Sequence, residues 1–81
     1  MKLPRDLSGQ RLATLLRRYE YETVRQTGSH VRLTSRIRSS EHSITIPSHR
    51  ALSVGTLDGI LGEIAQHLEM DKRDLAEELF G

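Results

Sequence analysis

The sequence predicts an α+β fold made of one helix, three antiparallel strands and two more helices, with the helices on one face of the sheet. Two observations carry this prediction. Apolar residues recur at intervals of three and four near both ends of the chain, whereas they alternate with polar residues from Tyr21 to Ile46. The length of 81 residues leaves room for one domain only, so we expect a single domain over residues 1–81, with 70–81 as a C-terminal helical extension.

The first helix is expected over residues 9 to 18. Three apolar side chains recur there at helical spacing, at Leu12, Leu15 and Leu16. Ser8 precedes them, and its hydroxyl can accept a hydrogen bond from one of the first backbone N–H groups, which have no partner inside the helix. Ser8 is therefore the predicted N-cap.

A β-hairpin is expected to follow. Two runs of alternating residues, 21–26 and 29–34, flank Thr27-Gly28, and this pattern predicts a two-residue turn at these positions. In the resulting register Arg25 lies opposite His30.

The register divides the hairpin side chains between the two faces of the sheet, because successive side chains of a strand point to opposite faces. The residues expected to face the core are Val24, Val31 and Leu33. Those expected on the opposite face are Thr23, Arg25, His30, Arg32 and Thr34.

The remaining elements follow from similar patterns. The segment 35–41 is polar and predicts a connection, and 42–46 alternates as a third strand that ends at Pro47, which has no N–H for the ladder. An apolar stripe from Val54 to Leu68 predicts an amphipathic helix, and Asp71 can cap a last short helix. With all helices on one side, the other face of the sheet is expected to stay open.

Composition excludes several classes of function. The chain has no cysteine, which removes disulfides, thiolate metal sites and cysteine nucleophiles. No stretch is long and apolar enough to span a membrane or serve as a signal peptide, so we expect a cytoplasmic protein.

The charge is unevenly distributed along the chain: residues 1–50 hold ten Lys or Arg against four Asp or Glu, whereas residues 51–81 hold two against seven. Such polarity is typical of a chain with an anionic partner, and equally of a solvated basic surface.

The four histidines give no metal signal. His30, His42, His49 and His67 lack the short spacings of zinc sites, so we expect neither a metal nor another cofactor. His67 is expected to be an ordinary surface residue. Ser29 and His30 are adjacent in a predicted strand, so their side chains should point to opposite faces and should not act together.

His30 among arginines on an open sheet is the strongest chemical candidate. RNA cleavage through the 2′-hydroxyl needs a group that exchanges protons near neutral pH, cations for the phosphate and an acid for the departing 5′-oxygen. Imidazole suits the first role, and Arg25 and Arg32 are candidates to bind phosphate. The competing interpretation is an ordinary surface histidine.

Three short motifs resemble the HicA toxins, small enzymes of bacterial toxin–antitoxin pairs that cleave messenger RNA. The first is Leu7-Ser8-Gly9 before a leucine-rich helix, and the second is the run from Arg25 to His30, which ends in Gly-Ser-His. The third is Ile46-Pro47 followed by Gly55-Thr56-Leu57. Their order and spacing cover nearly the whole chain.

This resemblance implies a fold like that of double-stranded-RNA-binding domains, α-β-β-β-α, in which His30 is catalytic without a metal. It also implies a HicB-type antitoxin that covers this histidine. His49 resembles a further histidine of the family and is a candidate acid or phosphate contact. Two features depart from the family pattern: Val31 stands where many members have a second histidine, and the basic residues are mostly arginines.

Two other functions remain open. One is a non-catalytic RNA-binding module of the same fold, in which the basic face holds backbone phosphates. The other is an interaction domain whose acidic C-terminal segment docks a partner.

Overall fold

A computed structural model describes residues 2–48 and 50–81. Its elements, in chain order, are α1 (Gly9–Leu15), the 3₁₀ turn η1 (Leu16–Tyr19), β1 (Glu22–Thr27), β2 (His30–Ser35), the 3₁₀ turn η2 (Ile37–Ser39), β3 (His42–Pro47), α2 (Val54–Leu68) and α3 (Lys72–Phe80). This order confirms the predicted α+β class with a short C-terminal helix. It is also the order that the family resemblance implies.

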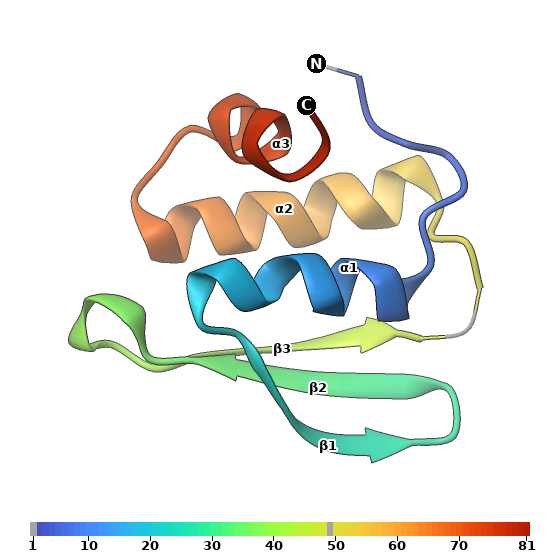
Figure 1. The fold of residues 1–81 in the computed structure, drawn as a ribbon, viewed down its shortest axis with the longest axis horizontal. Coiled ribbons are helices and arrows are strands. Elements are labelled where there is room, and N and C mark those ends of the chain that lie inside the picture. The colour runs from blue at the N-terminus through green and yellow to red at the C-terminus, as the bar shows by residue number, and fades with distance from the viewer. Residues whose placement is uncertain (1, 49) are drawn as a thin grey trace.

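The three strands form one antiparallel sheet in the order β1-β2-β3. Helix α1 packs against β2 and β3, α2 packs against β3, and α3 packs against α2. All three helices thus lie on the same side of the sheet (Figure 1). The other face of the sheet is open, as predicted.

Each α-helix begins at a side-chain cap. The Oγ of Ser8 accepts a hydrogen bond from the backbone N–H of Arg11 at 3.1 Å, as predicted for the first helix. Ser53 caps α2 in the same way, and the carboxylate of Asp71 caps α3. These bonds satisfy N–H groups that have no partner within the helix.

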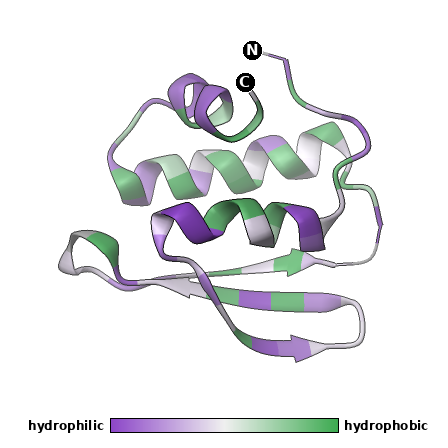
Figure 2. Cartoon of the chain, viewed as in Figure 1, coloured by the Kyte–Doolittle hydropathy of each residue, from purple (hydrophilic) through white to green (hydrophobic). Residues whose placement is uncertain are grey.

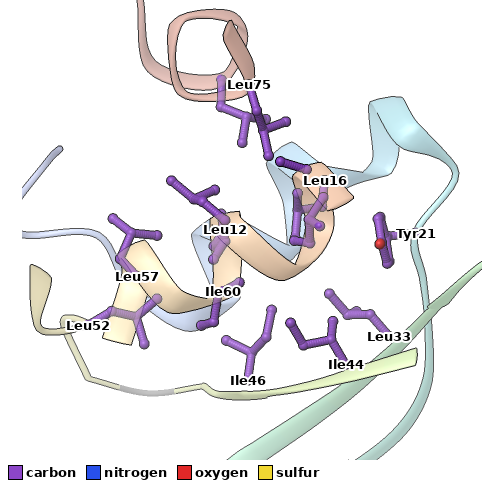
Figure 3. Close-up of a cluster of buried hydrophobic side chains, with 14 of the residues drawn as sticks. Leu12, Leu16, Tyr21, Leu33, Ile44, Ile46, Leu52, Leu57, Ile60 and Leu75 are labelled. Atoms are coloured by element: carbon purple, nitrogen blue, oxygen red, sulfur yellow. The ribbon is translucent and has the colours of Figure 1, made fainter. Parts of the chain in front are cut away.

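The core lies between the sheet and α1 and α2. Leu12 and Leu16 from the first helical segment meet Leu33 and Ile46 from the sheet, and all four are fully buried (Figure 3). Apolar and polar residues alternate along β2, so that only one face of the strand is apolar (Figure 2). Leu75 extends the core to α3. No helix within 2–48 or 50–81 is long and apolar enough to cross a membrane.

The hairpin register differs from the prediction. The turn residues are Gly28 and Ser29 instead of Thr27 and Gly28, so Thr27 lies opposite His30 and Arg25 lies opposite Arg32. Gly28 has a positive φ of 20°, which glycine adopts without steric cost. The prediction of an Arg25–His30 pair was therefore wrong, although both residues still lie on the open face, because residues two apart share a face.

A β-bulge between Thr23 and Arg25 causes two further errors in the prediction. Thr23 pairs with Leu33 and so belongs to the helix-facing side. Val24, predicted to lie in the core, is 60% exposed. An inserted residue reverses the alternation on one side of a bulge, and this change cannot be read from the spacing of apolar residues.

Candidate active site

The candidate site lies at the end of the sheet where the β1–β2 turn meets the end of β3. His30, the first residue of β2, is exposed on the open face. It lies between Thr27 of β1 and Pro47 of β3, which are its register partners on either side. Opposite residues of antiparallel strands share a face, so His30 stands in a row of small side chains that leave its ring accessible.

A shallow depression lies on one side of His30. It has a volume of about 290 Å³, and its lining residues are Arg25, Thr27, His30, Arg32 and Thr45. An Nη1–H of Arg32 donates to the Oγ1 of Thr45 at 3.1 Å, which helps to hold this guanidinium in place. The structure thus brings together His30, Arg25 and Arg32, the three described residues that the sequence singled out.

A second depression also borders His30, at the end of the sheet. It has a volume of about 270 Å³ and is lined by Ser29, His30, Pro47, Ser48 and Arg50. Sequence reasoning missed Arg50, because it belongs to a connection with no periodic pattern. Pro47, which ends the third strand, was visible in the sequence, but its pairing with His30, which brings the end of β3 beside this histidine, comes from the tertiary structure.

Ser29 contacts the imidazole directly. Its Oγ lies 3.1 Å from Nδ1 of His30, a hydrogen bond whose donor depends on the tautomer of the ring. The expectation that these two side chains point to opposite faces was wrong, because Ser29 belongs to the turn and not to the strand. Side chains alternate only where the backbone is extended.

Backbone hydrogen bonds hold the segments around His30 together. The N–H of Ser48 donates to the carbonyl of Ser29 at 2.8 Å, and the N–H of Gln10 donates to the carbonyl of Ser48 at 3.1 Å. The start of α1 also approaches β3 so closely that a Cβ added to Gly9 would lie 1.6 Å from the carbonyl oxygen of Pro47. The turn, the end of β3 and the first turn of α1 therefore form one connected frame.

The charge around His30 is positive. The residues that line the two depressions include three arginines and no carboxylate. Arg25 and Arg50 are exposed and form no ion pair with any residue among 2–48 and 50–81. Their guanidinium groups are thus available to an anion such as a phosphodiester.

A second cluster of titratable groups lies at the other end of the sheet. The hydroxyl of Tyr21 lies 2.6 Å from Nδ1 of His42, whose Nε2 lies 3.2 Å from a carboxylate oxygen of Glu63. His67 stacks on His42 with ring centroids 5.0 Å apart, so it is not the ordinary surface residue that was expected. Burial, and secondarily the charge of Glu63, raises the pKa of Tyr21.

This second cluster links β3 to α2 through the contacts of His42 with Glu63 and His67. Among the residues that the structure describes, no three His, Asp or Glu side chains are grouped in a way that could hold a metal ion. His49, the remaining predicted contact, lies outside the described residues.

Comparison with known protein families gives a match over most of the chain. The family described as "HicA toxin of bacterial toxin-antitoxin" matches residues 9–66, a range that includes His30, both depressions and most of α2. Helix α3 lies beyond the matched range. No curated protein and no solved structure matches the chain.

Proposed function

Because the chain belongs to the HicA toxin family of bacterial toxin–antitoxin systems, we propose that this toxin is an endoribonuclease that cleaves messenger RNA at His30. The observation that supports the proposal is an exposed imidazole between two depressions lined by arginines and by no carboxylate. The proposed reaction uses the 2′-hydroxyl of the RNA itself as the nucleophile and arginines as the cations, so it requires no metal.

In the proposed reaction His30 accepts the proton of the 2′-hydroxyl as the 2′-oxygen attacks the adjacent phosphorus. The bond between phosphorus and the 5′-oxygen breaks, and a protonated group or water supplies a proton to the departing oxygen. The products are a 2′,3′-cyclic phosphate and a 5′-hydroxyl end. Arg25 and Arg32 would bind backbone phosphate oxygens of the RNA next to the imidazole and so position the reacting phosphorus beside His30.

Two further roles belong to this proposal. A HicB-type antitoxin would neutralise the toxin by covering the open face around His30, which no element of the described chain covers (Figure 1). His49 would act as an acid or a phosphate contact, and this assignment stays a prediction. We expect the reaction to take place in the cytoplasm, where messenger RNA is translated.

A non-catalytic RNA-binding module is the second candidate. Both depressions beside His30 are shallow, and the same arginines would hold RNA without cleaving it. The two functions differ in one outcome only, the integrity of the RNA.

The test compares the wild-type protein with His30→Ala and with Arg36→Ala. Arg36 forms an ion pair with Glu41 beyond the other end of β2, so its variant controls for the loss of a surface side chain. Expressed from a tightly repressed promoter, the wild type and Arg36→Ala should arrest growth and shorten messenger RNA, whereas His30→Ala should do neither. Equal RNA cleavage by wild type and His30→Ala would overturn the catalytic role. Intact RNA with every protein would favour the binding module.

A further inference from the structure

His30 is the residue shared by the two depressions. One depression contains Arg25 and Arg32, and the other contains Arg50. A single phosphate bound beside the imidazole would need only one of these two depressions. Two basic depressions that share His30 and no other lining residue are instead suited to a ligand with several phosphates in a row.

Arg50 is held at a defined place beside His30. The backbone is anchored before it, where the N–H of Ser48 donates to the carbonyl of Ser29 at 2.8 Å. The backbone is anchored again directly after it, where Ala51 forms an antiparallel bridge with Ser8. The guanidinium therefore extends from a residue whose next neighbour in the chain is tied to Ser8, which reduces the entropy lost when it binds an anion.

Arg50 is also free to bind. Its side chain is exposed, it forms no ion pair among residues 2–48 and 50–81, and no carboxylate lines the depression that contains it. By contrast, Arg36 pairs with Glu41 and Lys72 pairs with Asp58. An unpaired guanidinium beside neutral hydroxyl groups favours a phosphodiester as its ligand.

We propose that a single RNA strand crosses His30, with one flanking phosphate bound by Arg25 and Arg32 and the phosphate on the other side bound by Arg50. This inference rests on the proposed function and adds the path of the substrate to it. It assigns single-stranded RNA as the substrate, because an A-form duplex does not hold the 2′-oxygen in line with the departing 5′-oxygen. Arg50 is a binding residue in this scheme and takes no part in proton transfer.

The first test uses DNA oligonucleotides that contain one ribonucleotide, so that cleavage occurs at a known place. One series is extended only on the 5′ side of the ribonucleotide and the other only on the 3′ side. With wild-type protein, extension on either side should raise kcat/KM. In Arg50→Ala, extension on one side should no longer raise kcat/KM, a loss of about fivefold. In Arg25→Ala, extension on the other side should no longer raise it. The control Arg36→Ala should respond to extension on both sides.

The second test measures binding without cleavage. The probe is a single-stranded oligodeoxynucleotide, which has no 2′-hydroxyl and stays intact. The slope of log Kd against log salt concentration should fall by about 0.7 for each phosphate that the protein no longer neutralises, so Arg50→Ala should lower it and Arg50→Lys should keep it. Thermal unfolding of each variant confirms that it is folded, as expected for a substitution of an exposed side chain.

The outcomes separate this inference from the proposed function. The proposed path of the strand is wrong if Arg50→Ala still gains kcat/KM from extension on both sides and keeps the wild-type salt dependence of Kd. It is also wrong if Arg25→Ala and Arg50→Ala lose the gain in kcat/KM from the same side. Faster cleavage of duplex than of single-stranded substrate would also overturn it. If His30→Ala cleaves as well as the wild type, the catalytic proposal fails, whereas the salt slope of Arg50→Ala still decides whether Arg50 binds phosphate.

Discussion

The hydroxyl oxygen of Ser29 lies 3.1 Å from Nδ1 of His30, and this contact joins the last residue of the hairpin turn to the first residue of β2. A neutral imidazole carries one N–H, so a hydrogen bond at one ring nitrogen decides what the other can do. If Nδ1–H donates to Ser29, Nε2 retains its lone pair and can accept the proton of a 2′-hydroxyl. Ser29, in the turn, thus orients the imidazole of His30, the first residue of β2.

The first prediction concerns this contact. Ser29→Ala should lower kcat for RNA cleavage by about fivefold to tenfold, since a hydrogen bond of this kind is worth about 1 kcal/mol, and should leave KM unchanged. Ser29→Thr keeps the hydroxyl and should restore most of the rate. Single-turnover and steady-state kinetics on one oligonucleotide measure both constants. A change confined to KM, or an equal loss in Ser29→Thr, would show that Ser29 does not act by positioning His30.

The second prediction concerns the approach of α1 to β3. A Cβ on Gly9 would lie 1.6 Å from the carbonyl oxygen of Pro47, which is backbone and cannot rotate away. Gly9→Ala should therefore lower the free energy of unfolding by about 3 kcal/mol or more. Gly59 is the matched control, because its added Cβ meets nothing within 4 Å and Gly59→Ala should raise stability by up to about 1 kcal/mol. Urea unfolding measures both, and similar effects of the two changes would contradict the close approach.

The third prediction concerns pH. The pKa of Tyr21 is raised by burial and by Glu63, so above about pH 10 the unfolded chain loses this proton while the folded chain keeps it. The stability that the neutral phenol contributes is thus fully present below pH 10 and is lost as the pH rises further. Tyr21→Phe should be less stable at pH 8, because its hydrogen bond with His42 is lost, yet should lose less stability between pH 8 and pH 11.

Urea unfolding across this pH range is the measurement for Tyr21. The control is Tyr19→Phe, because the pKa of Tyr19 is also raised by desolvation but its side chain is only partly buried. Tyr19→Phe should therefore reduce the loss of stability at alkaline pH by less than Tyr21→Phe does. Parallel losses of stability in the wild type and Tyr21→Phe would show that another group controls unfolding at high pH.

The fourth prediction concerns α3, which lies outside the residues matched by the family. Leu75 is fully buried against the core, and the carboxylate of Glu78 accepts a hydrogen bond from the hydroxyl of Tyr19. Leu75→Ala should therefore lower the free energy of unfolding by about 2–5 kcal/mol in one cooperative transition. The exposed Glu77→Ala is the control and should change it by less than about 0.5 kcal/mol. Two separate transitions in the wild type would show that residues 70–81 unfold independently of the rest.

The wrong prediction of the turn between β1 and β2 shows which property of the hairpin the local sequence does not determine. A turn at Thr27-Gly28 and a turn at Gly28-Ser29 both use the same glycine, so the local sequence does not separate them. The pairing of β2 with β3 places Val31 opposite Ile46 and Leu33 opposite Ile44, and α1 and α2 bury these four side chains. Strand β1 adapts to this sheet through its bulge, which leaves Val24 exposed.

The sequence by itself determined the order of the elements, their caps and the face on which His30, Arg25 and Arg32 lie. These properties follow from periods of two and of three to four residues, which depend only on backbone geometry within one element. Only the tertiary structure decided that Ser29 contacts His30, that Arg50 lies beside it and that His67 stacks on His42. These contacts join turns, connections and separate elements, and their positions result from the packing of the whole core, which no local period encodes.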